Sequence, residues 1–118
     1  MMLKDRVILI SNVTHFAGMP TSKVLSDLGA AVVAHDESFT NDLVRSTFEA
    51  DNTGVTAFAP QHPKMLAESV VKRFGRIDAL VSNDIGEAKR AKIEDADVDD
   101  FRSVLEDMTV APFSWPVL

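Results

Sequence analysis

The sequence predicts an α/β fold in which helices cover both faces of one parallel sheet. Four short apolar runs, rich in β-branched residues, alternate along the chain with segments of helical periodicity. The runs are apolar at both alternating positions, which is typical of strands buried on both sides of a parallel sheet. Right-handed connections between such strands give a doubly wound sheet, for which we expect the strand order 3-2-1-4.

The first half of the alternation has clear start and stop signals. The expected strands are Val7–Ile10, Ala31–Ala34, Val55–Phe58 and Ile77–Val81. Pro20 can occupy a first helical position, and Gly29 ends that helical segment. Thr40 is the expected N-cap of the second helix, with Asp42 close to the positive end of its dipole.

Two further helices complete the alternation. The third is expected to begin at Pro63 and to end at Phe74, before Gly75. The fourth is expected to begin near Asp97 and to turn an apolar face inward. That face comprises Val98, Phe101, Val104, Leu105 and Met108.

Composition narrows the class of protein. The 118 residues, 46% of them hydrophobic, can build one core, and we expect a single domain over residues 1–118. A net charge of −6 without a basic patch argues against nucleic-acid binding, and no run is long enough to span a membrane. The absence of cysteine excludes disulfides, and no cluster of His and carboxylates indicates a metal. A cytoplasmic location is expected.

The turn after the first strand, residues 11–20, stands where a dinucleotide-binding fold places three glycines. Only Gly18 is present, Phe16 adds a bulky ring, and Pro20 lacks an N–H donor. Asp36 follows the second strand, where a ribose-binding carboxylate is expected. One acid without the glycines is weak support for NAD, so we expect no bound cofactor.

Three blocks of sequence carry a resemblance to a known family. They are NVTHFAGM at 12–19, HDESF at 35–39 and VSNDI at 81–85. Together and in this order they resemble the N-terminal half of halohydrin dehalogenases, relatives of the short-chain dehydrogenase/reductase superfamily with a Rossmann-like sheet. The resemblance covers nearly the whole chain.

The resemblance implies a cofactor-free lyase. Such enzymes expel halide from a vicinal haloalcohol to form an epoxide, and in reverse they open epoxides with small anions. The partners implied are therefore a haloalcohol or epoxide and a halide. On this pattern Phe16 lines the halide pocket, Asp84 supports the catalytic arginine, and Asn83 and Ile85 border the site.

The family's base is a tyrosine, and this sequence contains none. The resemblance places the Ser, Tyr and Arg set after the fourth helix. We expect the chain to be truncated within that helix, so the 118 residues alone are expected to be inactive. The asparagine of the dehydrogenase tetrad aligns near Met108. The full-length relatives assemble as homo-tetramers, and an oligomer is expected of the full-length protein.

Other interpretations stay open. The chain could belong to an NAD(P)-dependent short-chain dehydrogenase with an irregular turn, or it could be a non-catalytic Rossmann-like binding module. From the residues alone, Phe16 also fits a loop aromatic packed over the core, and Asp84 fits the cap of a short helix or turn. His15 is expected in the turn, and His35 at a strand end with a hydrogen bond to the backbone.

Overall fold

The computed structural model describes residues 1–83 and 91–115, and within them a four-stranded parallel sheet. Its strands are β1 (Val7–Ser11), β2 (Ala31–His35), β3 (Val55–Phe58) and β4 (Ala79–Ser82). The order is β3-β2-β1-β4, and all three neighbouring pairs are parallel. The predicted fold class and strand order are confirmed, although the fourth strand begins at Ala79 and not at Ile77.

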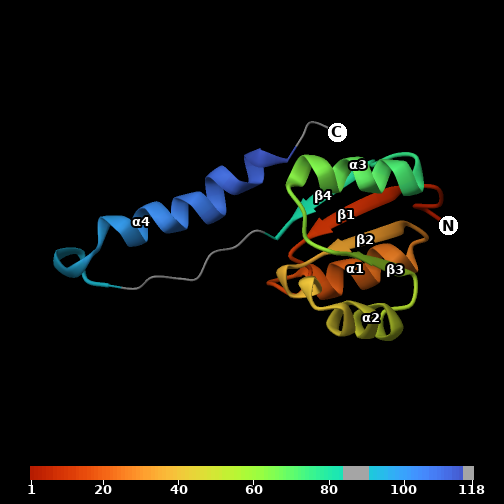
Figure 1. Ribbon diagram of the computed structural model, residues 1–118, viewed down its shortest axis with the longest axis horizontal. Helices are drawn as coiled ribbons and strands as arrows, with labels where there is room; N and C mark the ends of the chain where they lie inside the picture. The colour runs from red at the N-terminus through yellow and green to blue at the C-terminus, as the bar shows by residue number, and fades with distance from the viewer. Residues whose placement is uncertain (84–90, 116–118) are drawn as a thin grey trace.

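Helices cover both faces of the sheet (Figure 1). Helices α1 (Gly18–Asp27) and α2 (Asp42–Asp51) lie on one face, and α3 (Pro63–Phe74) lies on the other. Because successive strand residues point to opposite faces, Ile8 and Ile10 join the cluster on the α1/α2 side. Val7 and Leu9 pack instead with Leu66 and Val70 of α3.

The helix boundaries are partly as predicted. Helix α3 has Pro63 at its first position and Gly75 at its C-cap with φ 86°, as the sequence indicates. Helix α1 begins at Gly18, two residues before the predicted start at Pro20. The predicted N-cap Thr40 is wrong: Asn41 caps α2, and its Oδ1 accepts hydrogen bonds from the N–H groups of Leu43 and Val44 at 2.9 and 3.2 Å. Thr40 belongs to the short helix η1 (Glu37–Thr40).

Asp78 ties β4 to the amino end of β1. Its Oδ2 accepts a hydrogen bond from the N–H of Val7 at 2.8 Å, and its Oδ1 forms ion pairs with Arg76 and Arg6. The bond from Val7, followed by the bond from Arg76, lowers the pKa of the Asp78 carboxyl below its ordinary value. The pairing of β1 with β4 is therefore fixed at this end by a charged group.

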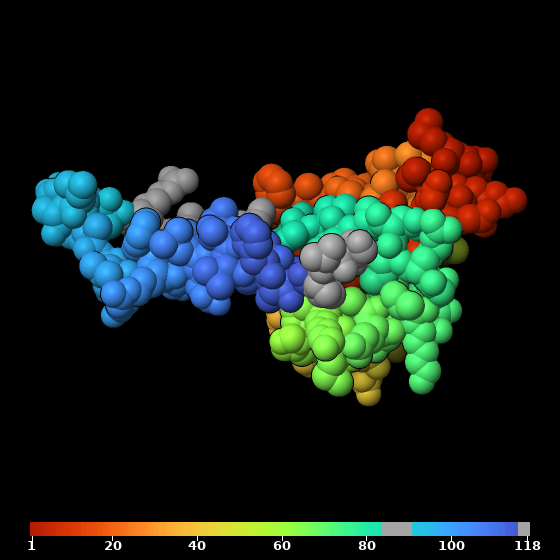
Figure 2. Space-filling model, turned by 90° about the horizontal axis from the view of Figure 1, so that it is seen from above, coloured from red at the N-terminus to blue at the C-terminus, as the bar shows by residue number. Residues whose placement is uncertain are grey.

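Helix α4 (Val98–Leu105) begins as predicted, with Asp97 as its N-cap. The prediction that its apolar face points inward is wrong, since no residue of α4 is buried and Phe101 is 65% exposed. Figures 1 and 2 show this segment extending away from the sheet. Amphipathic periodicity predicts the helix but does not determine what covers it. Among the described residues, no helix is long and apolar enough to cross a membrane.

Candidate functional site

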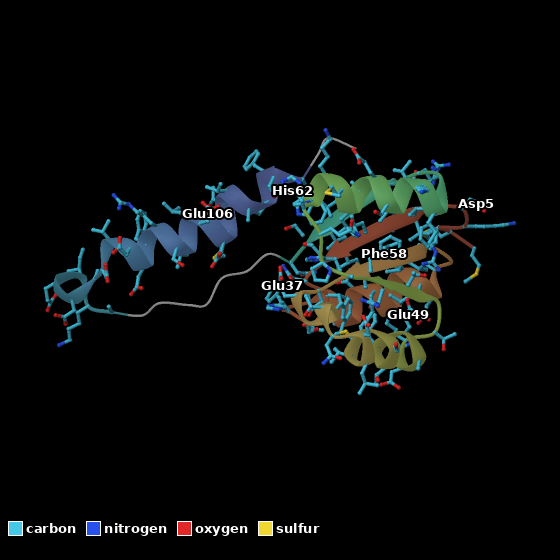
Figure 3. The ribbon with its side chains drawn as sticks, in the orientation of Figure 1. Asp5, Glu37, Glu49, Phe58, His62 and Glu106 are labelled. Carbon is cyan, nitrogen blue, oxygen red and sulfur yellow. The ribbon has the colours of Figure 1, made fainter. Side chains whose placement is uncertain are left out.

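The candidate site lies at the carboxyl edge of the sheet, where open α/β folds bind ligands. The predicted site residues follow β1 and β4, which are neighbours in the sheet although they are far apart in the chain. In Figure 3, Glu37 and His62 mark this edge, and Asp5 marks the opposite one. His62 caps α3, its Nδ1 accepting a hydrogen bond from the N–H of Lys64 at 3.3 Å.

The turn after β1 is bound to the end of β2 by its backbone. Three consecutive N–H groups donate to two residues: Asn12 to His35 Nδ1 at 3.1 Å, Val13 to the His35 carbonyl at 2.9 Å, and Thr14 to Asp36 Oδ1 at 3.0 Å. His35 therefore ends its strand with a hydrogen bond to the backbone, as expected. These three donors are therefore already paired within the protein.

Gly18 lets α1 pack directly against this turn. A Cβ at this position would lie 2.1 Å from the carbonyl oxygen of Val13. Real Cβ contacts are not that short, so only glycine fits here without movement of the backbone. The one glycine kept in the turn thus serves the packing of the helix, which is one of the three glycine roles in dinucleotide-binding folds.

Asp36 lies behind the same turn and is 1% exposed. Its Oδ1 accepts hydrogen bonds from the N–H and hydroxyl of Thr14 at 3.0 and 2.7 Å, and its Oδ2 accepts from the N–H and hydroxyl of Ser38 at 3.1 and 2.6 Å. Burial raises the pKa of Asp36, but the hydrogen bonds from Ser38 and Thr14 outweigh it and hold the pKa below its ordinary value. A buried, ionised carboxylate with both oxygens engaged has little capacity for a ribose.

Phe16 lies in the same turn, two residues after Thr14. Its side chain is 84% exposed, and its backbone is left-handed with φ 44°. The alternative interpretation, a loop aromatic packed over the core, is wrong, because this ring contributes almost nothing to the core. Phe is seldom left-handed, and such residues persist where the surrounding structure holds them.

Asn83 follows β4 and is 4% exposed. Its N–H donates to Ser11 Oγ at 3.2 Å, which places it beside the end of β1. Among the described residues its side-chain Nδ2 is buried without an acceptor. Asp84 and Ile85, the other two predicted site residues, lie outside the described residues.

Sequence reasoning missed several residues at this edge. Thr14 and Ser38 were not singled out, although Ser and Thr close to a buried Asp are common donors to it. A pocket of about 160 Å³ also opens here. It is lined by Asn12, His35, Glu37, Gln61, Pro63, Ala111, Ser114 and Trp115. The rings of His35 and Trp115 meet edge to face, 6.1 Å apart. Over residues 1–83 and 91–115, no group of three or more His, Asp or Glu could hold a metal ion.

Comparison with known proteins first defines the class. No family model matches the chain. A structure from Pseudomonas syringae, described as a putative short chain dehydrogenase, superposes with a TM-score of 0.76 at 24% identity over 96% of this chain and 49% of that one, which shows the shared fold. A curated 2-dehydro-3-deoxy-D-gluconate 5-dehydrogenase from Formosa agariphila is 28% identical over 94% of this chain and 44% of its own length. The chain thus has the Rossmann-like fold of these dehydrogenases and is similar to them in sequence.

Two solved structures are more similar. One, described as a dehalogenation enzyme, is 46% identical with a TM-score of 0.91, over 96% of this chain and 46% of that one. The other is a halohydrin dehalogenase bound to ethyl (2S)-oxiran-2-ylacetate, 33% identical with a TM-score of 0.86, over 92% of this chain and 43% of that one. Within the superfamily, the chain resembles halohydrin dehalogenases and spans less than half the length of these relatives.

Proposed function

We propose that this chain is the halide-binding part of a halohydrin dehalogenase, a cofactor-independent lyase. In the reaction, a base takes the hydroxyl proton of a vicinal haloalcohol, the oxygen attacks the neighbouring carbon, and the carbon–halogen bond breaks to release halide and an epoxide. Small anions open epoxides in the reverse direction. The sequence contains no tyrosine, so the family's base has to come from outside these 118 residues.

The turn after β1 is the observation that carries the proposal. It presents the exposed ring of Phe16 at the carboxyl edge of the sheet. The edge of an aromatic ring is electropositive and can contact a large, weakly hydrated anion. No side chain caps the start of α1, two residues further on, and the positive end of the helix dipole there favours an anion.

Asn83 and Asp84 are proposed for the other side of the site. Among the described residues the buried Nδ2 of Asn83 has no acceptor, and it is proposed to donate to a substrate oxygen or an anion. Asp84 is proposed to support the catalytic arginine, and Ile85 to border the pocket, as the resemblance implies. These roles are independent of any nucleotide.

The internal bonds of the turn support a site without a nucleotide. The donors at Asn12, Val13 and Thr14 and both oxygens of Asp36 are already used within the protein. A dinucleotide would have to replace these bonds, and the turn lacks the glycines that let a pyrophosphate approach the backbone.

Halide binding tests the proposal directly. Bromide binding to the full-length protein that carries this sequence can be followed by the line width of bromine NMR, and halide release can be followed from several haloalcohols without added nucleotide. Phe16→Ala is expected to weaken bromide binding about five- to tenfold. This change corresponds to the loss of about 1–1.4 kcal/mol, which is typical of an aromatic contact.

Phe113→Ala is the matched control, because Phe113 is a phenylalanine with nearly the same exposure, 86% against 84% for Phe16. It is expected to bind bromide as the wild type does. Equal binding by both variants, or no halide release from any haloalcohol, would contradict the proposal.

A nicotinamide-dependent dehydrogenase is the second candidate. The similarity to a curated dehydrogenase favours it, as does the position of Asp36 after β2. It predicts saturable binding of NAD in a fluorescence titration, with NADP excluded by charge repulsion at Asp36. The absence of saturable binding at millimolar nucleotide would eliminate this candidate.

We also propose that the full-length protein is a homo-oligomer, a tetramer by analogy with the family. Helix α4 leaves Val98, Phe101 and Leu105 exposed, which is a substantial apolar face for a surface helix. Light scattering after size exclusion measures the mass of the particle, and a monomer at micromolar concentration would contradict this part of the proposal.

A further inference from the structure

We propose that Asp36 is a positioning residue that holds Phe16 in the halide site. The inference rests on the proposed function of Phe16. In place of a ribose, the carboxylate of Asp36 binds the turn after β1, and the orientation of the Phe16 ring depends on that attachment. Halide affinity is therefore controlled by a buried residue that does not itself touch the halide.

The first observation is how the four hydrogen bonds of Asp36 are divided. Oδ1 accepts both of its bonds from Thr14, in the turn after β1, and Oδ2 accepts both of its bonds from Ser38, in η1 after β2. One carboxylate therefore joins the turn after β1, 22 residues before Asp36 in the chain, to η1. Because hydrogen bonds to a charged acceptor are stronger than neutral ones, this attachment is firm.

The second observation is the place of Thr14 in the turn. The N–H groups of Asn12, Val13 and Thr14 all donate to the end of β2, and Thr14 is the last of the three. Phe16 follows two residues later. Thr14 is thus the attachment to β2 nearest to the ring.

The third observation is that side-chain packing does little to hold Phe16, whose backbone lies in a turn closed by the hydrogen bond from the N–H of Gly18 to the carbonyl of His15 at 2.9 Å. A left-handed backbone is unfavourable for a residue with a Cβ, and Phe16 has φ 44°. Its side chain is 84% exposed, so packing does not offset that cost. The hydrogen bonds of the turn hold this conformation, and with the Thr14 attachment removed the turn can relax and the ring can change direction.

A matched pair of variants separates positioning from general stability. Thr14→Val and Ser38→Ala each remove one hydroxyl bond to the same carboxylate, but only Thr14 belongs to the Phe16 turn. In the full-length protein we expect Thr14→Val and Asp36→Asn to weaken bromide binding by about tenfold, the equivalent of one bond to a charged group. The bromide affinity of Ser38→Ala is expected to lie within about twofold of the wild-type value. Thr14→Ser, which keeps the hydroxyl, is expected to retain the wild-type affinity.

Amide hydrogen exchange supplies a second readout. Exchange at residues 14–16 is expected to accelerate in Thr14→Val and in Asp36→Asn, and to stay unchanged in Ser38→Ala. If Asp36→Asn does not fold, Thr14→Val decides the question alone, because it keeps the carboxylate.

The outcomes distinguish this inference from the function on which it rests. Wild-type binding of bromide together with unchanged affinity in Thr14→Val would overturn the positioning role and leave the dehalogenase proposal standing. Equal weakening by Thr14→Val and Ser38→Ala would also overturn it, since Asp36 would then act only on stability. Failure of the wild type to bind bromide would overturn both.

Discussion

Gly18 leaves no room for a side chain, and Gly18→Ala tests how closely α1 approaches the turn. An added Cβ would lie 2.1 Å from the carbonyl oxygen of Val13, 2.6 Å from its carbonyl carbon and 2.7 Å from its Cα. These are backbone atoms of a fully buried residue, and the N–H of Val13 is itself bonded to His35 at 2.9 Å. Relief of the overlap requires α1 or the turn to move.

The magnitude follows from two opposing effects. Replacing glycine by alanine in a helix interior stabilises it by about 1 kcal/mol, which is an upper limit for Gly18 at the first position of α1. Overpacking of a close contact costs about 1–3 kcal/mol, and contact with rigid backbone places Gly18→Ala at the upper end of that range. We therefore expect a net loss of about 2 kcal/mol, which is large against a total stability of about 5–15 kcal/mol.

Urea unfolding followed by far-UV circular dichroism measures the change in free energy. Lys23→Ala is the control, because Lys23 is exposed on the same helix and its substitution is expected to change stability by no more than about 0.5 kcal/mol. A Gly18→Ala protein as stable as the wild type would refute the close approach of α1 to the turn.

Two further predictions concern charge and backbone strain. The pKa values of Asp36 and Asp78 are both lowered from 3.8 in the folded protein. As pH falls, the unfolded chain therefore binds protons at these carboxylates before the folded protein does. The stability that the two carboxylates contribute is complete above about pH 4 and is lost as pH falls through their folded pKa values. Urea unfolding at successively lower pH measures the free energy of unfolding as a function of pH. Asp36→Asn is expected to reduce its pH dependence, and a free energy of unfolding that stays constant below pH 4 would contradict the prediction. Phe16→Asn is expected to be about 0.5–1 kcal/mol more stable than Phe16→Ala, because asparagine tolerates the left-handed backbone, while both variants lose bromide affinity. Equal melting temperatures would show that the strain at this position is small.

The strand order could be predicted from the sequence because the strand signals are local. Runs apolar at every position, such as Val7–Ile10, suit only a sheet covered on both faces, and Pro63 and Gly75 delimit α3 without help from tertiary contacts. The cap of α2 could not be predicted, since Thr40 and Asn41 are both good caps. The choice between them follows from η1, whose first turn is bonded to Asp36.

The chemistry of the candidate site depends on contacts that are distant in sequence. The sequence places a carboxylate at Asp36, where a nucleotide-binding protein has one, and that position alone is compatible with either function. What distinguishes them is Thr14, which lies 22 residues away and occupies Oδ1. No local pattern reveals that pairing. The same limit applies to α4, whose periodicity predicts an apolar face but not its partner.

The two candidate functions make opposite demands on Asp36. To bind a ribose, the carboxylate would have to give up bonds to Thr14 or Ser38 that it now holds at 2.6–3.1 Å. Hydrogen bonds to a charged group are each worth about 1.5–3 kcal/mol, so the release of two would lower nucleotide affinity by roughly a hundredfold or more. The same release would free the turn that holds Phe16. If the dehalogenase proposal is correct, a variant opened to nucleotide by Thr14→Gly should therefore lose bromide binding as it gains affinity for NAD. Under the dehydrogenase proposal, the wild type already binds NAD, and bromide affinity has no relation to Thr14.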